Sequence, residues 1–567
     1  MNFTTPHYRQ QNMIFPLLHP LYLHSSVTFT SVPACALITH LIFKYKEPFN
    51  PIIYTVTLLA VLPSILSGLL AQELHSIAAI PLTFIAFYSI LALSIVGYRL
   101  SPFHPLSSYP GPIFCKISKL WLYVQAKDGK QHLYIQALHR RYHSDIVRIG
   151  PNEVSIIEPD ALADVLGRNG VPKAPVTRAR HLFPDTKPTL LNVEDLDEHA
   201  KQRIPWTRAF SATALKDHEP KVAKRCLQLA EYLSRTSGPI NMTHLIRRWS
   251  YDLMSDVVYS GGSEILRDGD SQGALKYEDK SISFFMLFEQ MPWMAWFARE
   301  LPFVKAGISH MRKAAFQRAA SRIAQEAKTK DLYYYLRNED TGKDLRPLED
   351  ILPESVLATI AGTETVAVAS IALFYLVIQR PDVYWHLQAE VDAFYPAGTD
   401  PTDSRNYKEM SYLDAVIHET LRLYPAVPSG SVRHLSSNMP GRLLGSHYVP
   451  PGTTIRYHCH SVLRDERNFS PHSDKFWPER WLIASGKMPA PESFQHNSVM
   501  FIPFSYGPAN CVGKHLAFLE IRMVVCTIMQ RLNLKYAEGW DPKEWERHLL
   551  ESFAYESGEL RLEVESR

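Results

Sequence analysis

Two long apolar stretches near the N-terminus restrict most strongly what this chain can fold into. Residues 51–72 and 77–98 contain no charged side chain, and each exceeds the roughly 20 apolar residues that a helix needs to cross a bilayer. A third stretch, residues 27–43, is shorter and carries His40, so it is a weaker candidate. These stretches are too long and too numerous for a cleaved signal peptide. We therefore predict an N-terminal membrane region over residues 1–99 with two to three transmembrane helices. A single anchor, with the earlier segments packed at the surface, is the alternative.

Basic residues and prolines around these stretches indicate how the rest of the chain is held. Lys44 and Lys46 precede the first long stretch, the connecting loop AQELHS carries no Lys or Arg, and Arg99 follows the second. Because positive side chains stay on the cytosolic side, three spans would leave the large C-terminal part in the cytosol. Four prolines then fall within residues 98–114. Since proline fixes φ and removes a donor, we predict a semi-rigid, proline-rich hinge over residues 100–114.

The composition is that of a globular protein without a polyanionic partner. Apolar residues make up 46% and charged residues 21% of the chain, and the formal net charge is only +3, so we expect no nucleic-acid binding. The six cysteines form no C-x-x-C pair, which argues against a disulfide framework and against a structural zinc site. A reducing compartment is the simplest interpretation.

Residues 115–567 have the patterns of one catalytic domain that is mainly α with small β-sheets. Apolar and polar side chains alternate in residues 143–157 around Pro151-Asn152, which predicts a hairpin, and residues 425–459 form a second irregular region. Residues 352–382 predict a long helix that begins at Pro353 and ends before Pro381.

That long helix has the apolar length of a further membrane span. Glu364 lies in its middle, however, and a carboxylate is costly in lipid. We therefore favour a buried central helix.

The stretch FIPFSYGPANCVGK, residues 501–514, contains one cysteine, Cys511, between two glycines. A lone cysteine is more often a small buried apolar residue than a ligand. Here Gly507 and Gly513 allow a sharp turn and a close approach to a flat object, and a helical pattern follows over residues 516–529. A thiolate at a helix N-terminus is stabilised by the amides there. One soft ligand in such a turn suits an axial ligand to haem iron better than a zinc site.

The stretch resembles the haem-binding loop of the cytochromes P450, F-S-x-G-x-x-x-C-x-G. The matching positions are Phe504, Ser505, Gly507, Cys511 and Gly513. Three further signatures precede it in the family's order: AGTET (361–365), HETLRLYP (418–425) and FWPERW (476–481). PGP at 110–112 resembles the family's proline-rich hinge. The resemblance covers roughly residues 100–567, and the apolar leader is similar to that of fungal microsomal members.

The resemblance implies a cytochrome P450 fold with haem b held by Cys511 as the iron ligand. It implies a buried network of Glu419, Arg422 and Arg480 that supports the haem face, whereas an ordinary surface ion pair is the alternative for the first two. It also implies that Thr365 opens a local distortion of the long helix and binds oxygen or water, while Glu364 relays protons. In the alternative, these two side chains bond only within their own helix.

Haem propionates need cationic donors, and one common donor is missing. Many family members carry a basic residue two positions before the cysteine, where this chain has Ala509. The resemblance offers His199, Arg203 and Arg433 instead, and Lys514 is a weaker choice because it points along the next helix.

The resemblance further implies a monooxygenase that inserts one atom of O2 into a C–H bond of a lipophilic, terpenoid-like molecule in fungal secondary metabolism. NADPH would supply the electrons through a separate cytochrome P450 reductase, because the chain has no G-x-G-x-x-G motif of its own. Lys514 and Arg522 would form the docking face. We expect an endoplasmic reticulum membrane protein with a cytosolic catalytic domain.

Two segments are candidates for substrate access, and two other functions remain open. Residues 284–304 are rich in Phe, Trp and Met, which suits either a core helix or a membrane-dipping access segment. Residues 178–192 form a loop suited to covering the distal pocket. One alternative function is a reductase-independent isomerase of lipid hydroperoxides, which would need no proton relay. The other is a non-enzymatic membrane protein, either a helical channel or a haem sensor.

Overall fold

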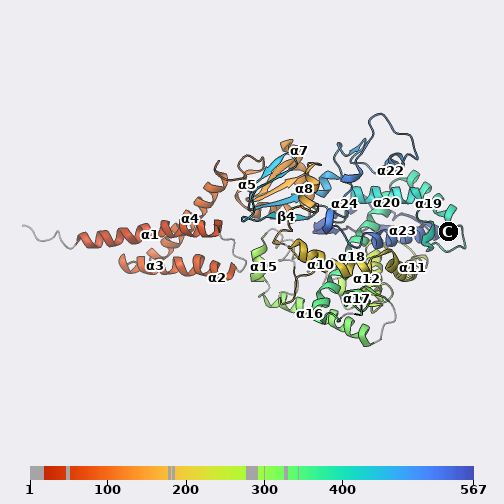
Figure 1. The fold of residues 1–567 in the computed structure, drawn as a ribbon, viewed down its shortest axis with the longest axis horizontal. Coiled ribbons are helices and arrows are strands. Elements are labelled where there is room, and N and C mark those ends of the chain that lie inside the picture. The colour runs from red at the N-terminus through yellow and green to blue at the C-terminus, as the bar shows by residue number, and fades with distance from the viewer. Residues whose placement is uncertain are drawn as a thin grey trace, which may run out of the picture. The chain divides into compact units, whose positions relative to one another are not determined.

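The computed structural model contains two compact units, which divide between Ser107 and Ser108. The described residues are 18–45, 51–176, 181, 185–271, 273–275, 291–298, 300–324, 330–342 and 344–567. Figure 1 shows helices in both units and all of the sheets in the larger, C-terminal one. The predicted class, mainly α with small β-sheets, is confirmed.

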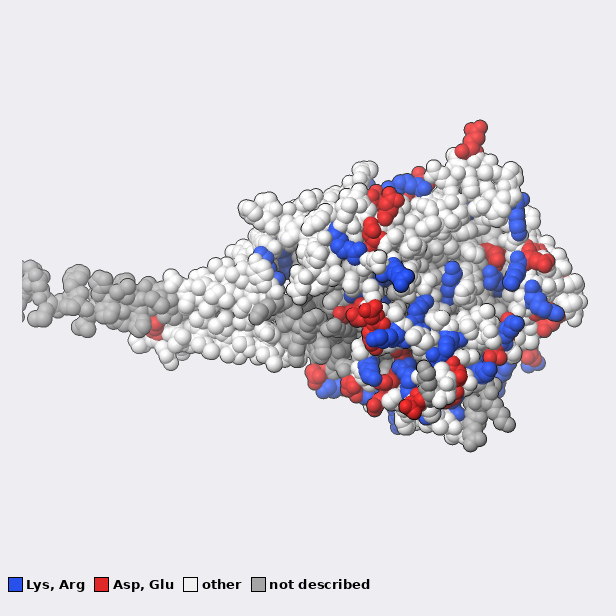
Figure 2. All heavy atoms as spheres, viewed as in Figure 1, with Lys and Arg blue, Asp and Glu red and all other residues white. Residues whose placement is uncertain are grey.

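The N-terminal unit is helical. Its elements are α1 (Leu18–Tyr45), α2 (Pro51–Val56), the π-helical turn η1 (Thr57–Val61), α3 (Leu62–Glu73) and α4 (Ala79–Leu100). Ile52–Glu73 and Ala79–Leu100 are long and apolar enough to cross a membrane, as the sequence predicts. The weaker candidate, residues 27–43, lies inside α1 but is not among the helices that meet this measure. Figure 2 shows very few charged side chains on the described part of this unit.

The segment predicted as a hinge divides between the two units. Residues 101–107 form turns that belong to the N-terminal unit. The Pro110 carbonyl accepts a hydrogen bond from the Arg148 amide at 2.7 Å. A Cβ at Gly111 would lie 2.2 Å from the Arg148 carbonyl oxygen. The PGP motif is therefore packed against the first strand of the C-terminal unit and is not a free connector.

The largest sheet has the strand order β1-β2-β7-β4. Its strands are β1 (Ile146–Gly150), β2 (Glu153–Ile156), β4 (Val432–Leu435) and β7 (Thr453–Tyr457). β1 and β2 pair antiparallel with Arg148 opposite Val154, which confirms the hairpin predicted around Pro151-Asn152. β7 runs parallel to β2 and antiparallel to β4, so residues more than 270 apart along the chain share one sheet.

The other sheets are smaller. One has the order β10-β13-β3, and three are two-stranded. Their strands are β3 (Ile240–Asn241), β5 (Arg442–Leu444), β6 (His447–Val449), β8 (Phe469–Ser470), β9 (Gln495–His496), β10 (Leu532–Tyr536), β11 (Leu550–Ser552), β12 (Ala554–Glu556) and β13 (Arg561–Ser566).

Helices make up most of the C-terminal unit (Figure 1). The α-helices are α5 (Ile113–Ile117), α6 (Lys119–Ala126), α7 (Gln131–Tyr142), α8 (Ala161–Leu166), α10 (Leu196–Ala209), α11 (Ala212–Ser234), α12 (Met242–Tyr259), α13 (Ile265–Asp268), α15 (Pro292–Ala298), α16 (Pro302–Ala324), α17 (Leu332–Leu336), α18 (Leu348–Ile378), α19 (Pro381–Phe394), α20 (Ser411–Leu423), α21 (Cys459–Val462), α22 (Glu479–Ala484), α23 (Lys514–Arg531) and α24 (Lys543–Arg547). The 3-10 turns are η2 (Ser404–Asn406), η3 (Ser498–Met500) and η4 (Gly507–Ala509).

The long helix α18 forms the centre of the main hydrophobic core. Of its most apolar window 78% is buried, against 17% and 22% for the two N-terminal candidate spans, which confirms the prediction of a buried central helix. The predicted start at Pro353 was wrong, because the helix begins at Leu348. Glu349 and Asp350 in the first turn favour the earlier start, and Pro353, inside the helix, removes a single helical hydrogen bond, the one that its N–H would donate to the Glu349 carbonyl.

Candidate functional site

Cys511 lies between the turn η4 and the first turn of α23. Its backbone N–H donates to the Phe504 carbonyl at 2.9 Å, which closes the loop. The side chain is exposed, yet protein packed around the sulfur raises the pKa of the thiol, and the Gly513 and Lys514 amides and the Arg203 guanidinium offset only part of that rise. The protein alone therefore does not maintain the expected thiolate. A metal cation would supply the remaining stabilisation, since coordination deprotonates a thiol.

The two glycines of this loop act differently from one another. Gly507 has a φ of +71°, and a Cβ there would lie 2.1 Å from the Leu166 carbonyl oxygen, so it allows the loop to pack on the end of α8. A Cβ at Gly513 would meet only the Cys511 sulfur, at 4.0 Å. Ser505 also adopts a left-handed φ of +63°, which is strained for a residue with a side chain. Phe504 packs against Phe518 of α23, with ring centroids 5.4 Å apart.

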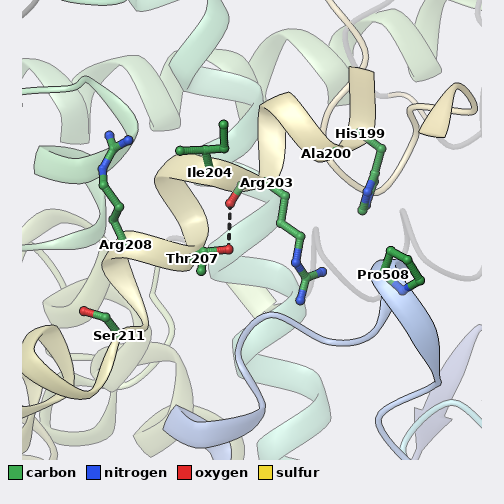
Figure 3. A pocket seen from close by; sticks show the side chains of 8 residues that line it. All are labelled: His199, Ala200, Arg203, Ile204, Thr207, Arg208, Ser211 and Pro508. Atoms are coloured by element: carbon green, nitrogen blue, oxygen red, sulfur yellow. Dashed lines mark hydrogen bonds between the residues drawn. The ribbon is translucent and has the colours of Figure 1, made fainter. Parts of the chain in front are cut away.

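Arg203 joins α10 directly to this loop. Its Nη1 donates to the Asn510 carbonyl at 2.6 Å, and its Nη2 donates to Asn510 Oδ1 at 2.7 Å. Figure 3 shows His199 and Arg203 extending from α10 toward the segment that carries Pro508. A cavity of about 580 Å³ is lined by these residues and by others of α10. The predicted propionate donor Arg203 therefore also holds the residue next to Cys511.

A cluster of basic side chains lies beside the loop. Arg433 is 2% exposed, and its Nε and Nη2 atoms have no hydrogen-bond partner among the described residues. Burial, together with the neighbouring charges of Lys173, Arg203 and Arg433, lowers the pKa of His199 to about 3. Burial and the same two arginines lower the pKa of Lys173 to about 7. The cluster therefore has donors in excess among the described residues, an arrangement that suits an anion.

Lys173 was not expected from the sequence. It pairs with Arg433 in an isolated antiparallel bridge, so the two side chains share one face although they are 260 residues apart along the chain. A single lysine in a loop carries no local signal of such pairing. Only the path of the chain between β2 and α10 brings it to the cluster.

The cluster and Cys511 fit a haem. The Cys511 thiol is exposed and can reach a metal ion. The buried guanidinium nitrogens of Arg433 that have no partner among the described residues suit carboxylates such as the two propionates. Ala509, which replaces the usual basic residue, sits in η4 without a charge to offer. Lys173 stands beside the donors that were predicted from the sequence, His199, Arg203 and Arg433.

The middle of α18 contains side chains that are less buried than those of the turns on either side. Leu357, Ala361 and Thr365 lie one turn apart and are exposed or half-buried, while the following turns are buried. The Thr365 hydroxyl donates to the Ala361 carbonyl at 2.6 Å within the helix. The helix is α-helical throughout, so the predicted distortion at Thr365 is absent from the described residues of α18. A Cβ at Gly362 would lie 2.4 Å from Met254 Sδ, which fixes α18 closely against α12.

Glu364 bonds outside its own helix. It is 7% exposed, and its Oε1 accepts from Arg247 Nη2 of α12 at 2.8 Å. The alternative in which both side chains bond only within α18 therefore fits Thr365 but not Glu364. Arg247 was not predicted from the sequence, because the ion pair depends on the packing of two distant helices.

Glu419, Arg422 and Arg480 meet in the interior, and all three are fully buried. Arg422 donates to Glu419 from Nη2 at 2.8 Å and from Nε at 2.9 Å, and Arg480 Nε donates to Glu419 Oε1 at 3.2 Å. The Trp477 amide and Trp481 Nε1 also donate to this carboxylate. Burial alone would raise the pKa of Glu419, but the two arginines outweigh burial and lower it. A surface ion pair is excluded.

The remaining sequence candidates are Arg522 and Lys514, predicted to form the docking face, and the two predicted access segments. Arg522 Nε forms an ion pair with Asp414 at 2.7 Å, so its charge is already compensated. Lys514 Nζ lies 5.8 Å from the Phe504 ring centroid. Much of the two predicted access segments, including residues 178–180, 182–184 and 284–290, lies outside the described residues.

Comparison with known proteins identifies relatives over most of the chain. The family model for Cytochrome P450 matches residues 108–562. The chain is 32% identical to cytochrome P450 monooxygenase nodW of Hypoxylon pulicicidum, over 84% of this chain and 86% of that protein. It is 31% identical to cytochrome P450 monooxygenase FCK2 of Fusarium pseudograminearum, over 79% of each chain. It is 30% identical to cytochrome P450 monooxygenase phqL of Penicillium fellutanum, over 83% of this chain and 81% of that protein.

Proposed function

Because this chain belongs to the cytochrome P450 family and is a monooxygenase of that family, we propose that it binds haem b through Cys511 and oxidises a lipophilic small molecule. The observation that carries the proposal is the exposed Cys511 thiol beside a buried basic cluster in which Arg433 has unpaired donors. A thiolate-ligated haem supplies the activation of O2 when it is bound.

The chain's own residues hold and orient this group. Arg433, His199 and Lys173 bind the propionates, and Arg203 fixes Asn510 so that the Cys511 loop keeps its place. Glu419, Arg422 and Arg480 have a structural role, because they join α20 to the segment around α22 through bonds in the interior.

Thr365 and Glu364, both in the middle of α18, are proposed to move protons. The Thr365 hydroxyl lies at the loosely packed middle of α18 and can exchange its bond to Ala361 for one to water. Glu364 is next to it in the chain, and its Arg247 partner is 18% exposed and so reaches toward solvent. A carboxylate near solvent and a hydroxyl one residue further along the helix suit stepwise proton delivery through water.

Electrons are proposed to come from NADPH through a separate cytochrome P450 reductase. Two described features suit docking near Cys511: the hollow between α10 and Pro508, and Ile204, which is 54% exposed at its edge. Arg522 contributes less than we expected because Asp414 pairs with it. The two apolar helical stretches near the N-terminus support anchoring in the endoplasmic reticulum membrane, with the C-terminal unit in the cytosol.

The substrate is proposed to be a lipophilic, terpenoid-like compound of fungal secondary metabolism. The support is the fungal origin of the relatives and the two N-terminal helical stretches that are long and apolar enough to cross a membrane. Metabolite profiles of a host that expresses the chain together with a reductase test the proposal. We expect a product that needs NADPH and disappears with Cys511→Ser. A product formed equally without NADPH and reductase would support the hydroperoxide isomerase and contradict the proposal.

A further inference from the structure

Residues 185–193, here called the Leu190 segment, are held from both sides by ionisable side chains. Glu354 of α18 accepts the Leu190 N–H at 3.0 Å through Oε1 and at 3.3 Å through Oε2. Lys173 Nζ donates to the carbonyls of Leu190 at 2.9 Å and Leu191 at 3.1 Å. Both peptide groups of Leu190 are thus bonded to side chains instead of to backbone.

The Glu354 contact lies in the interior and the Lys173 contacts are partly buried, unlike a second, exposed contact of the segment with α18. Glu354 is 3% exposed, and burial raises its pKa to about 7. By contrast, the Lys187–Asp350 ion pair on the same segment has a lysine that is 71% exposed. Solvent-exposed pairs contribute little, so the bonds from Glu354 and Lys173 restrain the segment more than the Lys187–Asp350 pair does.

Lys173 also belongs to the basic cluster beside Cys511. Its backbone pairs with Arg433, which places both side chains on one face, and its pKa is lowered by Arg433 and Arg203 as well as by burial. An ammonium group has three N–H donors, and among the described residues two of them reach the Leu190 segment. The third is available to an anion held by the cluster.

We propose that Glu354 and Lys173 are positioning residues: Glu354 tethers the Leu190 segment to α18, and Lys173 tethers it to the loop that pairs with β4 and couples its placement to the anion bound in the basic cluster, the haem propionates. This inference rests on the proposed haem site. An anion beside Lys173 favours its charged form, and a charged ammonium holds the two carbonyls more firmly than a neutral amine. Haem binding therefore stabilises the segment, and the segment in turn slows the loss of haem.

Amide hydrogen exchange of the full-length, haem-loaded protein tests the tether. We expect Lys173→Met to increase exchange across residues 186–193 by at least about tenfold, because two partly buried hydrogen bonds are lost. The haem should also dissociate severalfold faster into an excess of an apo-globin acceptor. Lys173→Arg keeps donors to the carbonyls and should restore both properties in large part.

Variants of Glu354, and of the exposed Lys187 as a control, distinguish the possible outcomes. Glu354→Leu removes the acceptor for the Leu190 N–H and should accelerate its exchange, whereas Glu354→Gln retains an acceptor oxygen and should not. Lys187→Met breaks the exposed pair and should leave exchange and haem release unchanged. Unaltered exchange in both Lys173→Met and Glu354→Leu refutes the tether. Faster exchange with unaltered haem release in Lys173→Met refutes the coupling to haem. A wild-type chain that binds no haem refutes the proposed function, while the Glu354 comparison still tests the tether.

Discussion

Replacing Glu419 by glutamine is expected to destabilise the C-terminal unit severely. The Glu419 carboxylate accepts five hydrogen bonds, from Arg422 Nε and Nη2, Arg480 Nε, the Trp477 amide and Trp481 Nε1. Glutamine has nearly the same shape, but it removes the negative charge and directs an NH2 group at two guanidinium groups. The variant therefore leaves two buried cations without a counter-charge.

The loss of unfolding free energy depends on how many hydrogen bonds Arg422 and Arg480 retain in the variant. Breaking a buried ion pair by removing one partner typically costs about 3–5 kcal/mol. Arg422 still donates to the carbonyls of Leu463, Ser473 and Lys475, and Arg480 still donates to those of Pro471 and His472. Because these bonds remain, we expect the lower end, about 3 kcal/mol. That is a large part of the ~5–15 kcal/mol by which domains are stable.

Guanidinium chloride unfolding of the purified chain in detergent, followed by circular dichroism, measures this loss. The matched control is Glu231→Gln, which breaks an exposed ion pair with Arg235, whose partners are 56% and 76% exposed. We expect the control to lose less than about 0.5 kcal/mol. If Glu419→Gln loses no more stability than the control, the carboxylate does not compensate the two arginines and the structural role of the network is wrong.

Two further predictions concern protons. For Thr365→Ala, we expect haem binding to be retained and product formation to fall about a hundredfold, with hydrogen peroxide accumulating per NADPH consumed, because the half-buried hydroxyl is lost; unchanged turnover would rule out a role for Thr365 in proton delivery. His139 has a pKa lowered from 6.5 to about 4 by burial, so its neutral form stabilises the fold fully above pH 6.5, and about 3 kcal/mol is lost as the pH falls from 6.5 to 4. Denaturation at several pH values should show that the unfolding free energy of His139→Gln falls less steeply with acid than that of the wild type. Parallel curves would contradict the lowered pKa of His139.

The sequence predicted the fold class and the main landmarks because they have local signals. The hairpin around Pro151-Asn152 has alternating side chains and a turn dipeptide, and the two N-terminal helical stretches have uninterrupted apolar composition. The burial of α18 was predictable from a single residue, Glu364, which is costly in lipid. The start of α18 was not, because proline is usually a helix-start signal, whereas Pro353 lies inside this helix, beyond its first turn.

The site residues that the sequence did not indicate are those whose role depends on distant packing. Lys173 meets Arg433 through an isolated bridge between a loop and β4, and Arg247 meets Glu364 across two helices. Asn510 adjoins Cys511 in the chain, yet its bond to Arg203 is visible only once α10 is in place. Motifs identify residues that any member of a family needs, whereas these contacts depend on how this chain packs.

The spectrum of the reduced carbon monoxide complex tests the central claim most directly. The account predicts that the purified wild-type chain binds haem and that this complex has the red-shifted Soret band of thiolate ligation. Cys511→Ser should lose that band, and any haem it retains through Arg433 and the rest of the basic cluster should give a spectrum without thiolate character. A wild-type complex without the red-shifted band, or a Cys511→Ser complex that keeps it, would contradict the assignment of Cys511 as the haem ligand.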